Sequence, residues 1–194
     1  QCNEDIALMR TIPGMTIINP ADDVEARAAV KAALDFNGPV YMRFGRLAVP
    51  VINDAETYKF ELGKGIVLRE GSDLTIVATG LMVNEALQAA ETLAGEGISA
   101  RVVNIHTIKP LDKELICKCA KETGVIVTAE EHSIIGGLGS AVAEAVTECC
   151  PVPVVKIGVN DEFGHSGPAV DLLKEFGLSA ENIVSKAKEA VKLK

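Results

Sequence analysis

The sequence contains no tryptophan, and aromatic residues make up only 4% of its 194 residues. A hydrophobic core must therefore be built from Val, Ile, Leu and Ala, within a hydrophobic fraction of 48%. No apolar run approaches the roughly 18 residues that a membrane-spanning helix needs, so we expect no membrane partner. The formal net charge of −8 likewise argues against a nucleic acid or an anionic membrane as a partner.

Motifs of several enzyme classes are also missing. The sequence holds no G-x-S-x-G nucleophile elbow and no phosphate-binding P-loop. The histidines His106, His132 and His165 do not have the spacing of metal ligands. A lone histidine near acids is more often a structural hydrogen-bonding group than a base. The residues alone therefore predict no catalytic residue, no metal ligand and no cofactor-binding residue in this chain.

The cysteines do not have the spacing of a zinc site or of a redox C-x-x-C pair. They are Cys2, Cys117, Cys119, Cys149 and Cys150. We expect reduced, small hydrophobic side chains in a cytoplasmic protein. The first residue is glutamine and no signal peptide is visible, which favours a piece of a longer gene product.

Strand and helix patterns alternate regularly from residue 74 onward. The expected strands are 74–78, 100–105, 125–129 and 152–157, and the expected helices are 83–93, 113–121, 140–149, 169–176 and 180–193. Asp112 precedes the second of these helices and is expected to be its N-cap. This alternation predicts an α/β fold with a mostly parallel, helix-covered sheet.

The first 46 residues form a smaller unit. The expected elements are a helix at 4–12, a strand at 15–19, a helix from 20 to 36 and a strand at 39–45. Two strands and two helices cannot close a core alone, which supports a chain that begins partway through a domain. Residues 47–65 are expected to form a linker, with one short strand near 64–68. We place the domain boundary near residue 60.

The most distinctive stretch is 124–146, where a strand, a polar loop and a glycine turn lead into a helix. Glu130 and Glu131 follow the strand and could be a general acid–base pair, although a loop-positioning or interface role is favoured. The turn glycines resemble a dinucleotide fingerprint only in part, because a seven-residue loop separates them from the strand. We expect them to allow close packing instead. These glycines are Gly136, Gly137 and Gly139.

Two arginines follow the strand at 39–45. Because successive side chains of a strand point to opposite faces of the sheet, Arg43 and Arg46 are expected on opposite faces. A guanidinium at the carboxyl end of a strand is well placed to hold a phosphate or a carboxylate through two hydrogen bonds. A surface salt bridge is an equally good interpretation from the residues alone.

Several stretches together resemble the transketolase family. Residues 4–10, 13–22 and 38–46 are similar to the end of its pyrimidine-binding domain, and 74–80, 104–112, 130–140, 161–167 and 172–178 are similar to its C-terminal domain. The resemblance covers essentially the whole chain and is closest to a separately encoded C-terminal subunit. It implies that residues 1–60 are the C-terminal part of the pyrimidine-binding domain plus a linker, and that 61–194 are the transketolase C-terminal domain.

The resemblance also implies a function. Family members use thiamine diphosphate and a divalent metal, usually Mg²⁺, to move a two-carbon ketol unit between sugar phosphates. In the family, the catalytic Glu and the cofactor-binding groups lie upstream of Gln1 or on a partner chain. This chain alone is therefore expected to be inactive and to bind no cofactor. Arg46 matches the arginine that grips the phosphate end of the substrate, and it is the one site residue that the resemblance carries over.

The implied partners are an N-terminal, diphosphate-binding subunit or domain and a second copy, in a homodimer formed through both domains. The implied setting is the pentose phosphate pathway in the cytoplasm. Two other interpretations remain: a fragment of 1-deoxyxylulose-5-phosphate synthase, with a similar Arg-x-x-Arg strand end, and a non-catalytic assembly or docking domain. Phe163-Gly164 and Phe176-Gly177-Leu178 favour transketolase. The sequence assigns no role to the three histidines and does not give the sugar pair.

Overall fold

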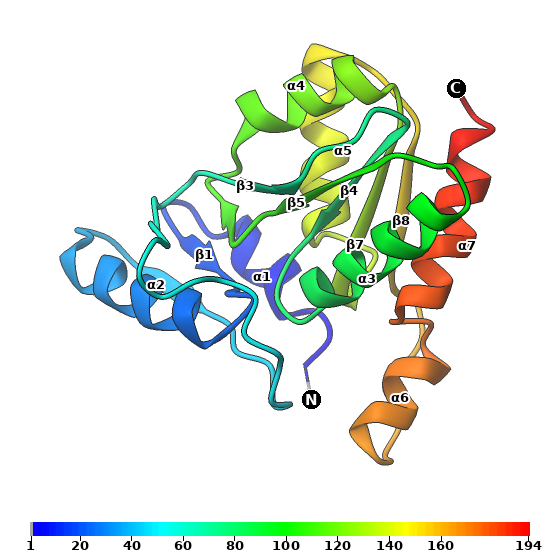
Figure 1. The fold of residues 1–194 in the computed structure, drawn as a ribbon. Coiled ribbons are helices and arrows are strands. Elements are labelled where there is room, and N and C mark those ends of the chain that lie inside the picture. The colour runs from blue at the N-terminus through cyan, green and yellow to red at the C-terminus, as the bar shows by residue number, and fades with distance from the viewer. Residues whose placement is uncertain (1) are drawn as a thin grey trace.

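The computed structural model describes residues 2–194 and contains the alternating elements that the sequence predicts (Figure 1). Its main sheet has five strands in the order β3-β5-β4-β7-β8. Their bounds are β3 Ile66–Arg69, β4 Leu74–Ala78, β5 Ala100–Asn104, β7 Ile126–Ser133 and β8 Val154–Val159. All five residues of the central strand β4 are buried, because helices cover both faces of the sheet. Alternation of apolar and polar residues is therefore absent from this strand.

Helices pack on both faces of this sheet, and the sheet separates the hydrophobic core into two layers (Figure 1). Ile76 of β4 faces the layer that contains Leu93 and Ile183, whereas its neighbour Val77 faces the layer that contains Ile116 and Val142. The first layer is covered by α3 (Met82–Gly95) and α7 (Ala180–Val191), and the second by α4 (Lys113–Thr123) and α5 (Leu138–Cys149). The short helix α6 (Ala169–Glu175) has no buried residue and extends away from the body (Figure 1).

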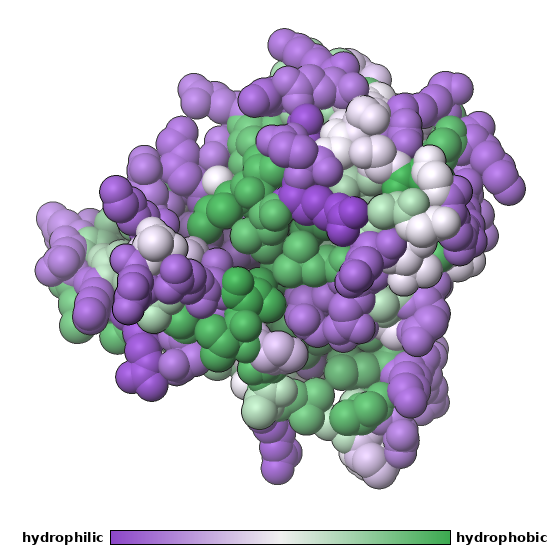
Figure 2. Space-filling model, viewed as in Figure 1, coloured by the Kyte–Doolittle hydropathy of each residue, from purple (hydrophilic) through white to green (hydrophobic). Residues whose placement is uncertain are grey.

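A second sheet of three strands, in the order β2-β1-β6, joins the N-terminal section to the rest of the chain. β1 (Thr16–Ile18) and β2 (Val40–Met42) are parallel, whereas β6 (Thr107–Lys109) pairs with β1 in the antiparallel direction. The helices of this section are α1 (Asp5–Thr11), which packs on the main body, and α2 (Asp23–Asp35), which lies to one side (Figure 1). The third strand of this sheet, β6, thus comes from the part of the chain that follows the linker at 47–65. Figure 2 shows apolar residues gathered along the middle of this view, with hydrophilic residues around them.

The predicted α/β fold with a mostly parallel, helix-covered sheet is confirmed, with three differences. The sequence patterns did not predict β6, and β3 runs antiparallel to β5. β7 continues to Ser133, so residues 134–137, rather than seven residues, connect it to α5. Within residues 2–194, no helix has both the length and the apolar character required to span a bilayer.

The prediction that all the cysteines are reduced is wrong for one pair. Cys117 of α4 and Cys149 of α5 form a disulfide, with Cα atoms 6.1 Å apart. The two residues are separated by 32 positions in the sequence, and they meet because α4 and α5 pack side by side. Cys2, Cys119 and Cys150 are free.

Candidate functional site

A pocket of about 760 Å³ lies where the N-terminal section meets the main sheet. The carboxyl end of β2 and the residues after it, 41–47, form one wall. Glu131 at the end of β7 and residues 164–167 before α6 contribute to the other walls. Both Arg43 and Arg46 line this pocket, so the structure brings together the two arginines that the sequence singles out.

Arg43 is paired with two acidic neighbours. Its Nε lies 3.0 Å from Oδ2 of Asp5, and its Nη1 lies 3.2 Å from Oε2 of Glu131. The hydroxyl of Tyr41 donates a hydrogen bond of 2.8 Å to the same Asp5 carboxylate. Burial, followed by this hydrogen bond, raises the pKa of Tyr41 to about 12. The salt-bridge interpretation therefore holds for Arg43, whose charge is compensated within the chain.

Arg46 differs from Arg43 in having an exposed side chain. Among residues 2–194, no carboxylate lies within ion-pair distance of its guanidinium. An arginine in this state keeps its hydrogen-bond donors available for an anionic ligand. The pocket therefore offers one uncompensated guanidinium at the strand end.

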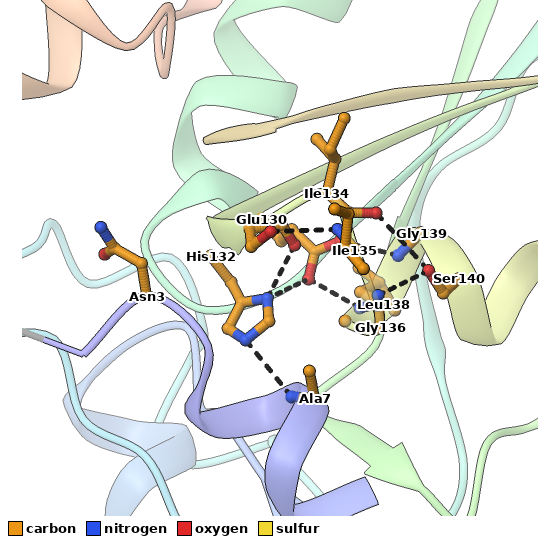
Figure 3. Close-up of polar contacts among 12 residues, drawn as sticks. Asn3, Ala7, Glu130, His132, Ile134, Ile135, Gly136, Leu138, Gly139 and Ser140 are labelled. Atoms are coloured by element: carbon orange, nitrogen blue, oxygen red, sulfur yellow. Dashed lines mark hydrogen bonds and ion pairs between the residues drawn. The ribbon is translucent and has the colours of Figure 1, made fainter. Parts of the chain in front are cut away.

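Glu130 is completely buried and caps helix α5 from the neighbouring strand (Figure 3). Its carboxylate accepts hydrogen bonds from the backbone amides of Leu138, at 2.6 Å, and Gly139, at 2.8 Å. Burial raises the pKa of Glu130 to about 7. The helix N-terminus that a dinucleotide fingerprint would offer to a pyrophosphate is thus occupied by a side chain of the protein itself.

The turn glycines are required for close packing. A Cβ atom on Gly139 would lie 2.7 Å from Oγ1 of Thr128, and one on Gly136 would lie 2.6 Å from Cβ of Ala7. Real Cβ atoms do not approach other atoms so closely, so larger residues would force the helix away from the strand. The predicted packing role of these glycines is confirmed.

His132 is buried and connects β7 to helix α1 (Figure 3). Its Nε2 accepts a hydrogen bond of 3.3 Å from the backbone amide of Ala7, and its Nδ1 donates one of 2.7 Å to the carbonyl of Ser133. Burial lowers the pKa of His132, in agreement with a neutral ring that accepts a hydrogen bond at Nε2. Strand alternation directs Glu131 to the face opposite Glu130 and His132, so Glu130 and Glu131 do not form an acid–base pair.

The other two histidines have different surroundings. His106 is buried beside Phe60, with ring centroids 4.3 Å apart, and its Nδ1 lies 2.9 Å from Oγ1 of Thr107. Burial lowers the pKa of His106 to about 4, which favours the neutral ring. His165 lines the pocket and is exposed, with its Nδ1 2.7 Å from Oε1 of Glu175.

Sequence reasoning did not predict the role of two acids near the start of α2. Asp22 caps this helix and also accepts hydrogen bonds of 2.8 Å from the backbone amides of Ile52 and Asn53. The buried carboxylate of Glu25 accepts a 2.5 Å hydrogen bond from the hydroxyl of Tyr58. The signal in the sequence is their spacing, since an acid at the N-cap followed three residues later by a Glu is typical of a helix start. Together they hold the segment after residue 51 against α2.

Asp112 has the N-cap role that the sequence predicts. Its carboxylate accepts hydrogen bonds from the amide of Leu115, at 3.1 Å, and from that of Gly65, at 3.0 Å. The first bond caps α4, and the second fixes the end of the linker just before β3.

Comparison with known proteins identifies the family. A model of the transketolase pyrimidine-binding domain matches residues 1–51, and a model of the transketolase C-terminal domain matches residues 63–183. The chain belongs to the transketolase family. Both matches agree with the stretches on which the resemblance rests.

Individual relatives give the same result. The chain is 51% identical over 191 residues to a 6-deoxy-6-sulfo-D-fructose transketolase subunit from Clostridium sp. (strain MSTE9), covering 98% of this chain and 59% of the relative. It is 46% identical over 188 residues to one of the subunits of an apulose-4-phosphate transketolase from Phocaeicola vulgatus, covering 97% of this chain and 60% of the relative. It thus spans less than two thirds of the length of these curated transketolase relatives.

A solved structure described as a split gene transketolase, inactive beta4 tetramer, superimposes on the whole chain with a TM-score of 0.93. The sequence identity is 49%, and the match covers 62% of that chain. The chain is therefore a part of a transketolase-family enzyme, with the fold of its C-terminal section.

The metal ion and the diphosphate of the cofactor that the family implies find no fitting site at two places in the described residues. Within the part that the structure describes, no group of three or more His, Cys, Asp or Glu side chains could hold a metal ion. The N-terminus of α5 is filled by Glu130 and cannot receive a diphosphate. We therefore derive no catalytic step through thiamine diphosphate or Mg²⁺ from these residues.

Proposed function

We propose that this chain is the C-terminal part of a thiamine-diphosphate-dependent transketolase and that Arg46 holds the anionic end of the sugar substrate. The observation that supports this proposal is the contrast between two neighbouring arginines. Arg43 is neutralised by Asp5 and Glu131, whereas Arg46 lines the same pocket without a carboxylate partner in residues 2–194. A guanidinium of this kind suits a phosphate, which accepts two parallel hydrogen bonds.

In this proposal, thiamine diphosphate supplies the carbanion chemistry when the rest of the enzyme binds it. The residues of this chain orient the substrate and limit its position in the pocket. The partner is a diphosphate-binding subunit or domain, and a second copy completes a homodimer. A cytoplasmic location and a place in the pentose phosphate pathway stay predictions from the family.

The names of two relatives bear on the anion. One relative is named for a sulfonated sugar and another for a phosphorylated sugar. Both substrates end in a tetrahedral oxyanion, and a planar guanidinium can donate to two oxygens of either group. We propose a phosphate for this chain, and a sulfonated sugar serves as the alternative substrate in the assay.

The proposed function is tested by ketol transfer between sugar phosphates with thiamine diphosphate and Mg²⁺. The assay compares this chain alone with the complete subunit mixed with its diphosphate-binding partner. We expect activity only in the mixture. In that mixture, Arg46→Ala should raise the KM for ribose 5-phosphate by roughly 10- to 100-fold, because a charge-assisted hydrogen bond contributes about 1.5–3 kcal/mol. The KM for ribose, which lacks the phosphate, should not change.

Arg27→Ala is the matched control. Arg27 is an exposed arginine of α2 whose partner is Asp23, and it does not line the pocket. An equal effect of both variants, or no effect of Arg46→Ala, would contradict the assignment. Condensation of pyruvate instead of ketol transfer would indicate a synthase of 1-deoxyxylulose 5-phosphate. Absence of both reactions in the mixture would indicate a non-catalytic assembly domain.

A further inference from the structure

We propose that Glu131 is a positioning residue that fixes the location of Arg46 through Arg43. This inference rests on the proposed function, because it assumes that Arg46 contacts the substrate. It gives the main sheet a role at the substrate site, because Glu131 belongs to β7.

The first step of the argument is the backbone around Arg46. The last ladder hydrogen bond of this strand joins the amide of Arg43 to the carbonyl of Ile18, at 2.8 Å. The next backbone anchor is the amide of Ile52, which donates to the carboxylate of Asp22. Within the described chain, no backbone hydrogen bond holds residues 44–51. Because the backbone is not tied down in this segment, side chains must determine where Arg46 lies.

The second step is the set of side-chain contacts next to Arg46. Arg43, three residues before it, is gripped by Asp5 and Glu131, and its side chain is only 12% exposed. The carboxylate of Glu131 also lies near Gly45, the residue directly before Arg46: a Cβ atom placed on this glycine would be 3.9 Å from Oε2 of Glu131. Glu131 therefore pairs directly with Arg43 and lies near Gly45, and both of these residues are within three positions of Arg46.

The third step concerns the other carboxylate that grips Arg43. Asp5 belongs to α1, and this helix is itself fastened to β7 and α5. Arg10 of α1 donates to the carbonyl of Gly136, at 2.7 Å, and the amide of Ala7 donates to Nε2 of His132. Residues 126–149 thus hold Arg43 by a direct contact through Glu131 and by an indirect one through α1. A shift of about 1 Å in a substrate-binding group can cost a large factor in rate, so such support matters.

The test uses Glu131→Gln in the complete, reassembled enzyme. The substitution keeps the shape of the side chain but removes the charge that pairs with Arg43. We expect the KM for ribose 5-phosphate to rise roughly 3- to 10-fold with kcat unchanged, as for other residues that act through a neighbour. The KM for ribose should stay constant, because that substrate does not use Arg46. A residue that only stabilised the fold would affect both substrates equally.

Glu144→Gln is the matched control. Glu144 makes a 2.6 Å ion pair with Arg10 and so also links α1 to α5, but it does not line the pocket. This variant should leave both KM values unchanged. A rise equal to that of Glu131→Gln would show a general loosening of α1 and would overturn the proposal.

A double variant separates the two proposals. When Arg46→Ala is already present, Glu131→Gln should have no further effect on the KM for ribose 5-phosphate. Independent, additive effects would overturn the positioning role. If Arg46→Ala raises this KM and Glu131→Gln does not, only the inference about Glu131 fails. If Arg46→Ala has no effect, the proposed function fails first.

Discussion

Glu130 and His132 lie two residues apart on β7 and cap different helices: Glu130 accepts two hydrogen bonds, and His132 accepts one, from backbone amides in a first helical turn (Figure 3). Glu130 caps α5, and His132 caps α1, which belongs to the N-terminal section. First-turn amides have no partner within their own helix, so each bond satisfies a group that burial would otherwise penalise. One face of a single strand therefore fixes two helices from different sections of the chain.

Glu130→Gln should change how stability depends on pH. Burial raises the pKa of Glu130 from 4.5 to about 7, so between these values the native state binds a proton that the unfolded state releases. The contribution of this group to stability is full below pH 4.5 and is lost as the pH rises through 7. From pH 5 to pH 8, the unfolding free energy of the wild type should fall relative to the variant by on the order of 3 kcal/mol. Urea unfolding at several pH values measures this difference. Parallel curves for the two proteins would contradict the expected shift.

His132→Leu should loosen helix α1. The substitution keeps a similar volume but leaves the amide of Ala7 without an acceptor, which costs about 1–3 kcal/mol. Hydrogen exchange of the α1 amides should become faster, while exchange in α3 should not change. The control is His165→Leu, because His165 is exposed and such surface changes typically stay within about 0.5 kcal/mol. If the α1 amides of His132→Leu exchanged as slowly as those of the wild type, the capping role of this histidine would be contradicted.

Asp22→Ala should release the segment that follows residue 43. The variant loses the cap of α2 and the acceptor of the Ile52 and Asn53 amides, for a total of roughly 2–3 kcal/mol. Limited proteolysis should cut residues 44–53 sooner than in the wild type. Asp23→Ala is the control. The carboxylate of Asp23 is next to Asp22 in sequence, but it is exposed and pairs only with Arg27 among the described residues. Equal cleavage rates for the two variants would be inconsistent with the anchoring role of Asp22.

The disulfide between Cys117 and Cys149 should be detectable by thiol counting. Labelling of the unfolded, unreduced protein should modify the three free cysteines, and reduction should raise the count to all five. For a separation of 32 residues, the chain-entropy model gives a stabilisation of about 4 kcal/mol. Cys117→Ser should therefore unfold at a lower urea concentration than the wild type. Dithiothreitol should lower the urea midpoint of the wild type but not that of the variant. Five reactive thiols before reduction would show that the bond does not form.

The elements that the sequence predicts well are those whose own residues show the apolar pattern of a buried strand or helix. Leu74–Ala78 is a run of apolar and β-branched residues, and it forms a central strand with the predicted bounds. Thr107–Lys109 has no such run and becomes β6 only because β1 offers it a partner. Strand pairing of this kind depends on residues that are remote in sequence, so local patterns cannot reveal it.

The same limit applies to the candidate site. The sequence placed Arg43 and Arg46 at one strand end, but it could not show which of them is neutralised. The carboxylates that grip Arg43 lie 38 residues before it and 88 residues after it. The Cys117–Cys149 pair was missed for the same reason. Arg46 as a substrate-binding residue and the domain boundary near residue 60 stay predictions.

The pairing of β6 with β1 has a consequence for building chimeric enzymes. A crossover placed in the linker, between residues 47 and 65, would join β1 and β2 from one parent to β6 from the other. The chimera would have to form its three-stranded sheet from strands of two different parents. Ile17 of one parent would then pair with residue 109 of the other. Exchange of residues 104–112 together with the N-terminal section would keep the parental sheet whole. The unit of recombination in this fold is therefore discontinuous along the gene.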